Sequence, residues 1–161
     1  MTEKLIQKMV EYYSGDPNRI QHFMKVHNFA KTIGVLEGME NKQLYVLETA
    51  AVVHDIGIKI AEEKYGSCAG PLQEKEGPAV ARALLDSLGY EKEVTERVCY
   101  LVGHHHTYTN IDGLDYQILV EADFLVNIYE DGLNRESAQN ICEKIFRTGT
   151  GKELCRQMFA L

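Results

Sequence analysis

The sequence contains few prolines, no low-complexity run and no cluster of lysine and arginine. Three prolines in 161 residues, with 45% hydrophobic and 25% charged residues, exclude a disordered or fibrous chain and are typical of one globular domain. Acidic residues outnumber basic ones by 24 to 17, which gives a net charge of −7. Because this charge repels phosphate backbones and no basic cluster reverses it locally, the sequence carries no strong signal for nucleic-acid binding.

The chain also lacks long hydrophobic runs. The longest, such as Ala50–Val53, are far shorter than the roughly 20 apolar residues of a membrane helix. Residues Met1–Gly15 alternate charged and apolar side chains too closely to form the core of a signal peptide. These features favour a cytoplasmic protein. No C-x-x-C pair is present, so we expect reduced thiols rather than a zinc knuckle at the four cysteines, Cys68, Cys99, Cys142 and Cys155.

Apolar residues recur at three- and four-residue spacing along most of the chain, and this period is typical of helices. A buried strand is the alternative for Ala50–Ile60, which is rich in Val and Ile, but its neighbours favour a helix. We expect a loop over about residues 61–73 and a following helix that opens near Glu76-Gly77-Pro78. The prediction is an all-α, single-domain helical bundle over residues 1–161. In it, the C-terminal helices of residues 131–161 pack on a motif-bearing core of about residues 19–130.

Four polar residues lie on or beside apolar helix faces: His22, His54, Asp55 and Asp123. Burying an unpaired imidazole or carboxylate is costly, so these side chains need partners. A hydrogen-bonded core network is one solution. A divalent cation is another, because it satisfies imidazole nitrogen and carboxylate oxygen together, and helical bundles build metal sites from inward-facing side chains.

These residues also lie in a recognisable order. The pattern His22-x-x-Lys25-Val26, followed by AAVVHDIG at residues 50–57 and by Glu121-Ala122-Asp123, resembles the HD-domain superfamily of metal-dependent phosphohydrolases. The resemblance spans roughly residues 19–130. It implies a helical bundle of the HD-domain type in which His22, His54, Asp55 and Asp123 bind a divalent transition metal (Mn, Fe, Co, Ni or Zn, with Mg as a further candidate).

Two points of the motif leave alternatives. His27 competes with His22 for the first position, although the spacing to Lys25 and Val26 favours His22. Binuclear members of the superfamily hold a second ion with two further histidines. Here Glu76 stands in the place of one of them, and His105 is the preferred candidate for the other among three consecutive histidines. Glu76 could instead pair with a nearby cation, so one ion and two ions both remain open.

The resemblance further implies hydrolysis by a metal-activated water. Asp55 would bind metal and accept a proton, and Glu76 or His104 would protonate the leaving group. Arg19, Lys59 and Lys64 are candidates to bind the substrate phosphate. We expect a small phosphorylated substrate, foremost a nucleotide.

Two other functions are alternatives to phosphoester hydrolysis, and the sequence also bears on the oligomeric state. A regulatory module that binds metal and nucleotide without turnover is the first alternative, and a di-iron oxygenase on the same scaffold is the second. Apolar positions that look exposed in the terminal helices motivate the expectation of a homodimer.

Overall fold

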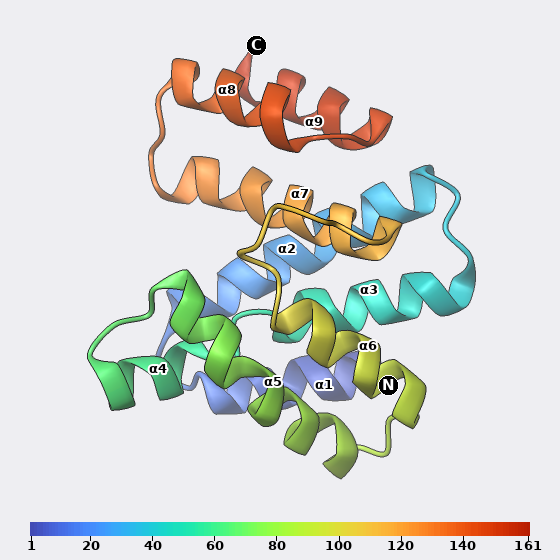
Figure 1. Cartoon of the computed structure of the whole chain (residues 1–161), viewed down its shortest axis with the longest axis vertical. Helices are drawn as coiled ribbons and strands as arrows, with labels where there is room; N and C mark the ends of the chain where they lie inside the picture. Colours follow the sequence, from blue (N-terminus) through green and yellow to red (C-terminus); the bar gives the residue numbers. More distant parts are fainter.

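The computed structural model describes residues 1–161 and is helical throughout, without strands. Figure 1 shows the helices, which are α1 (Thr2–Tyr12), α2 (Pro17–Leu36), α3 (Asn41–Val53), α4 (Ile58–Tyr65), α5 (Gly70–Ser87), α6 (Lys92–Val102), α7 (Leu114–Glu130), α8 (Arg135–Ile145) and α9 (Gly149–Phe159). The all-α prediction is confirmed. Because α3 runs through Val53, the strand alternative for this segment is wrong.

The centre of the molecule is formed by α2, α3 and α7, which contact one another. Val26, Val53 and Leu119, one from each helix, are completely buried there. In Figure 1, α4, α5 and α6 lie on one side of this centre, and α8 and α9 lie on the other side, against α7. No helix of the fold has both the length and the apolar character needed to cross a membrane.

The start of α2 follows from local sequence. Asp16 is the N-cap residue and its side chain accepts a hydrogen bond from the Arg19 amide at 3.1 Å. Pro17 occupies the first turn, where its missing N–H costs no helical hydrogen bond. These two signals place Arg19 and His22 within the first two turns of α2.

Residues 58–73 differ from the prediction. Instead of a loop from residue 61, the chain forms α4 up to Tyr65, stops at Gly66 with a φ of +66°, and begins α5 at Gly70. Pro71 rather than Pro78 marks the start of α5, because a proline in the first turn lacks only an N–H that would have no helical partner. Glu76 therefore lies in the second turn of α5 and not at its beginning.

A buried carboxylate joins α7 to the C-terminal helices. Glu121, which is completely buried, accepts hydrogen bonds from the backbone N–H groups of Arg147 (3.0 Å) and Thr148 (3.1 Å) and from Thr148 Oγ1 (2.6 Å). A Cβ at Gly151, in the first turn of α9, would overlap Glu121 Oε1. The N-terminus of α9 therefore sits directly on this carboxylate, where a negative charge is favoured.

Candidate metal centre

Three elements bring the predicted ligands together. His22 comes from α2, Asp123 from α7, and His54 and Asp55 from the turn that follows α3. All four side chains are buried. In this turn the Ile56 N–H donates to Val53 O at 2.9 Å, which directs the chain away from α3 directly after the ligand pair.

The turn is fixed by its neighbours. Tyr13, at the end of α1, donates its hydroxyl to Asp55 O at 2.7 Å, and Tyr12 donates to Ile56 O at 3.2 Å. Gly57 lies against the backbone of α5, where a Cβ would be 2.7 Å from Gln73 O. Only glycine permits this approach, which explains why the motif ends in glycine.

Four ligand atoms converge at one point. His22 Nε2 lies 3.2 Å from His54 Nε2, 3.1 Å from Asp55 Oδ2 and 3.1 Å from Asp123 Oδ1. His54 Nε2 lies 3.4 Å from each of the same carboxylate oxygens. Ligands about 2.1 Å from a shared cation are themselves about 3.0–3.4 Å apart in octahedral or tetrahedral coordination. The spacing therefore fits a single transition-metal ion.

The histidine tautomers agree with this fit. A carbonyl oxygen can only accept, so Nδ1 of His54 donates to Ala51 O at 2.7 Å. His22 Nδ1 donates in the same way to Glu130 Oε1 at 2.7 Å. Both Nε2 lone pairs then face each other across 3.2 Å, and buried Asp123 Oδ1 has no hydrogen-bond partner. Facing lone pairs and an unpartnered buried carboxylate oxygen require a positive charge between them.

The pKa values show the same preference for positive charge. Without an ion a proton takes this place: burial lowers the pKa of His22, but the adjacent carboxylates of Asp123 and Asp55 outweigh burial and raise it to about 10. The pKa of His54 is likewise raised well above its ordinary value, because the two carboxylates outweigh burial. Burial would raise the pKa of Asp55, yet the neighbouring imidazoles of His54, His105 and His22 hold it well below its usual range. The two carboxylates therefore stay ionised.

A second group of ligand atoms adjoins the first. Asp55, His105 and His106 offer ligand atoms that all lie within 4.8 Å of one another. His105 Nδ1 donates to Val102 O at 2.8 Å, so its buried Nε2 is a free lone pair, 3.4 Å from Asp55 Oδ1. Oδ2 of Asp55 faces the first group and Oδ1 faces the second, so this carboxylate is common to both groups.

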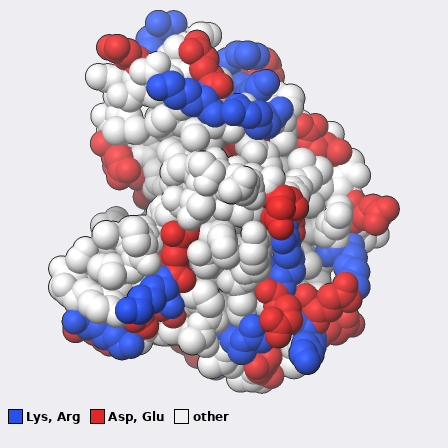
Figure 2. Space-filling view, in the orientation of Figure 1, with Lys and Arg blue, Asp and Glu red and all other residues white.

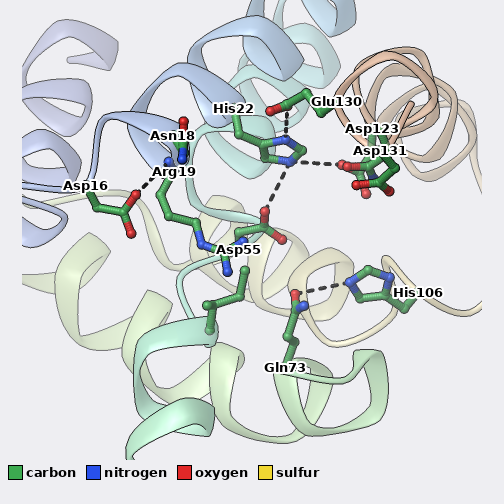
Figure 3. Close-up of a pocket in the computed structure, with 12 residues that line it drawn as sticks. Asp16, Asn18, Arg19, His22, Asp55, Gln73, His106, Asp123, Glu130 and Asp131 are labelled. Carbon is green, nitrogen blue, oxygen red and sulfur yellow. Dashed lines mark hydrogen bonds and ion pairs between the residues drawn. The ribbon is translucent and has the colours of Figure 1, made fainter. Parts of the chain in front are cut away.

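The metal centre lies in the wall of an open cleft of about 420 Å³. Figure 2 shows the molecule hollowed on this side, between α4 and the C-terminal end of α7, and Figure 3 shows His22 within hydrogen-bonding reach of Glu130, Asp55 and Asp123. The lining is almost wholly polar and comprises Asp16, Asn18, Arg19, His22, Asp55, Ile58, Gln73, His106, Asp123, Asn127, Glu130 and Asp131.

Other predicted site residues lie elsewhere. Glu76 accepts from Tyr65 Oη at 2.7 Å and from Lys64 Nζ at 3.1 Å, because α5 turns Gln73 and Gly77 toward the site and Glu76 toward α4. His104 stacks on Tyr100 with ring centroids 4.0 Å apart and is absent from the cleft lining. Neither Glu76 nor His104 belongs to a group of candidate ligand atoms or to the cleft lining.

The structure also shows where the alternative ligand His27 and the predicted phosphate-binding cations lie. His27 pairs with Glu48 at 3.0 Å, away from the cluster that contains His22. Lys59 lies over the Tyr12 ring and Lys64 pairs with Glu76, so neither reaches the cleft. Arg19 alone of the predicted phosphate-binding cations lines the cleft, and Figure 3 shows its side chain extending toward Asp55.

Several site residues were not predicted from sequence. Glu130 lies seven residues after Asp123, a spacing that returns to the same helix face and could have drawn attention to it. Asn127 lies on the same face, one turn after Asp123. Gln73 was missed because the predicted loop contained it, and His106 because one apolar face was used to choose among three histidines. The two are neighbours in the cleft wall, where Gln73 Oε1 lies 3.1 Å from His106 Nε2.

Fold and site together define a helical domain with a buried histidine–aspartate cluster that could hold a metal ion. The family model described as HD domain matches residues 19–147. The chain therefore belongs to the HD domain family, and this membership, together with the two ligand groups, supports a metal-dependent hydrolase.

A solved structure shares the fold. The crystal structure of a predicted HD superfamily hydrolase from an uncultured Thermotogales bacterium is similar to this chain, with a TM-score of 0.70 and 23% identity. The similarity covers 98% of this chain and 84% of that one. A search of curated proteins found no match.

Proposed function

We propose that this protein is a metal-dependent phosphohydrolase that acts on a small phosphorylated molecule. The observation that carries the proposal is the convergence of His22, His54, Asp55 and Asp123 in the wall of an open cleft that also contains Arg19. Buried ligands with a solvent-open side are typical of catalytic rather than structural metal sites, because a coordination position stays open to water and substrate.

The chain's own residues have distinct roles in this proposal. His22, His54, Asp55 and Asp123 would hold one divalent ion, and Asp55, His105 and His106 would hold a second. Such an ion supplies an activated water and positive charge for a phosphoryl group. Arg19 binds a phosphoryl oxygen at the mouth of the site. Burial, then the neighbouring His105, lowers the pKa of His106 to about 4, so its imidazole is neutral at pH 7 and suited to ligation.

The charge of the cleft supports a small substrate with little negative charge. Asp16, Glu130 and Asp131 line it together with the single cation Arg19. A nucleic acid would bring several phosphates against these carboxylates, which would repel them. Nucleotides are the substrate class expected from the sequence. Among them, a monophosphate fits this restriction on charge best.

Hydrolysis of p-nitrophenyl phosphate tests the proposed function. The protein is stripped of metal and then assayed alone and after addition of Mn²⁺, Fe²⁺, Co²⁺, Ni²⁺, Zn²⁺ or Mg²⁺. We expect turnover only with metal, and a loss in kcat on the order of 100-fold or more in Asp55→Ala. Glu76→Gln, outside the cleft, is the matched control and should retain activity. Metal binding without turnover would instead favour the regulatory module, and equal rates with and without metal would refute the proposal.

A further inference from the structure

The cleft continues beyond the metal centre along two helices. Asn127 on α7 and Asp131, the residue that caps the end of α7, follow Asp123 at intervals of four residues, which corresponds to roughly 6 and 12 Å along the helix axis. On the facing wall, Asn18 precedes His22 on α2 by the same interval. A substrate with its phosphoryl group at the metal centre therefore extends between an amide on one wall and an amide and a carboxylate on the other.

The polar residues that line the cleft fall into two groups, those that bond to other parts of the protein and those that do not. Asp16 caps α2, Glu130 binds His22, and Gln73 donates to Cys68 O at 2.7 Å. By contrast, the side chains of Asn18, Asn127 and Asp131 take no part in the protein's hydrogen bonds or ion pairs, and Figure 3 shows Asn18 and Asp131 among the residues that line the cleft. Amide and carboxylate groups of this kind offer both donors and acceptors to a ligand.

The lining offers almost no apolar surface. Ile58 is the single hydrophobic residue among the twelve that line the cleft, and none of them is Phe, Tyr or Trp. Nucleobases are held largely by stacking on aromatic or apolar side chains. Hydroxyl groups have the opposite requirement, since each donates to a carboxylate or amide oxygen and accepts from an amide N–H.

Charge restricts the substrate further. Asp16 and Asp131 stand at the cleft with one opposing cation, Arg19. A second phosphate placed beyond the metal centre would face these carboxylates and be repelled. The body that carries the phosphoryl group therefore has no further negative charge.

We propose that the substrate is a sugar or polyol monophosphate, a single phosphoryl group on a hydroxyl-rich body without further negative charge, bound by Asn18, Asn127 and Asp131. The proposal rests on the proposed phosphohydrolase function and names its substrate class. Arg19 and the metal centre take the phosphoryl end, and the outer amides and carboxylate take the hydroxyls.

A matched set of substrates tests this class. Metal-loaded protein is assayed for kcat/KM with ribose 5-phosphate, with AMP, which adds a base to the same phosphorylated sugar, with phosphoethanolamine and with p-nitrophenyl phosphate. We expect ribose 5-phosphate to exceed each of the other three by about tenfold or more, because hydrogen bonds to hydroxyls discriminate strongly against substrates that lack them or block their access. A preference for AMP would show a base site, and a preference for phosphoethanolamine would show an amine site; either overturns the inference.

Substitutions locate the recognition. The ratio of kcat/KM for ribose 5-phosphate to that for p-nitrophenyl phosphate should fall roughly five- to tenfold in Asn127→Ala and in Asp131→Ala, which corresponds to one lost hydrogen bond each. Asn140→Ala, an exposed asparagine on α8, is the matched control and should keep the ratio. An unchanged ratio in both cleft variants contradicts the inference alone. Absence of metal-dependent hydrolysis of every phosphoester, p-nitrophenyl phosphate included, refutes the proposed function and this inference together.

Discussion

Glu130 holds the His22 ring in the orientation that metal binding needs. Its Oε1 accepts from His22 Nδ1 at 2.7 Å and thereby directs Nε2 toward Asp55 and Asp123. Carboxylates that bind the far nitrogen of a ligating histidine fix its tautomer and raise the basicity of the ligating nitrogen. Glu130→Ala should therefore weaken metal affinity about 10- to 100-fold, measured by competition with a chromophoric chelator.

Two further variants decide whether Glu130 acts through His22. Glu130→Gln keeps an oxygen that can accept from Nδ1 and should lose less affinity than the alanine variant. Glu143→Gln, at an exposed position on α8, should bind metal as the wild type does. Equal affinity in Glu130→Ala and wild type would show that His22 needs no orienting partner.

The sequence indicates site residues where they are adjacent in a motif or lie on the apolar face of a helix. His54 and Asp55 are adjacent, and His22 and Asp123 lie on apolar faces, so their convergence could be expected. Glu130 lies at a helical spacing from Asp123, so its place on the same face could also be expected. Gln73 could not be, because it becomes a site residue only through the packing of α5 against the centre. Glu76 was expected in the site but does not lie there. Because α5 begins at Gly70 rather than near Glu76, the Glu76 side chain turns toward Lys64.

Among the elements, the turn between α3 and α4 depends on close backbone contact. A Cβ at Gly57 would lie 2.7 Å from both Gln73 O and Gly77 N, which are backbone atoms that cannot move aside. Gly57→Ala should lower the free energy of unfolding by about 1–3 kcal/mol in urea titrations, because it forces α5 away from the turn.

Gly149 provides the control for this substitution. It lies at the start of α9, and a Cβ there would have no other atom within 4 Å, so Gly149→Ala should leave stability nearly unchanged. If the two alanine variants unfolded at the same urea concentration, close packing of α5 on the turn would not be a constraint.

Glu121 makes a second close contact between helices, from α7 to the start of α9. Its carboxylate receives both backbone and side-chain hydrogen bonds where α8 leads into α9. Glu121→Ala should lower the free energy of unfolding by about 2–4 kcal/mol, since buried donors lose their partner, and should expose α9 to hydrogen exchange before α3. Uniform exchange across both helices would contradict a local role for this carboxylate.

The helical elements themselves were largely predictable because apolar spacing reports the core-facing side of each helix. The exception is residues 58–73, where short α4 is too brief for periodicity to register and Pro78, inside α5, resembles a helix start. Packing against the turn after α3, not local preference, decides where α5 begins.

For the whole molecule, metal binding and stability are linked. The ligands come from α2, α7 and the turn after α3, so an ion that binds only the folded chain stabilises all three. At a free metal concentration 100 times Kd, the gain is about 2.7 kcal/mol. Removal of metal with a chelator should therefore lower Tm by several degrees, and re-addition should restore it. An unchanged Tm would mean that the cluster is held by its own hydrogen bonds.

Metal content tests most directly whether His22, His54, Asp55 and Asp123 form a metal centre, as we claim. Elemental analysis is made on wild type and on Asp55→Ala, both purified without chelator or nickel affinity and both shown to be folded by circular dichroism. We expect one or two transition-metal ions per chain in the wild type and a loss of them in the variant. Equal metal content in the two proteins would contradict the claim.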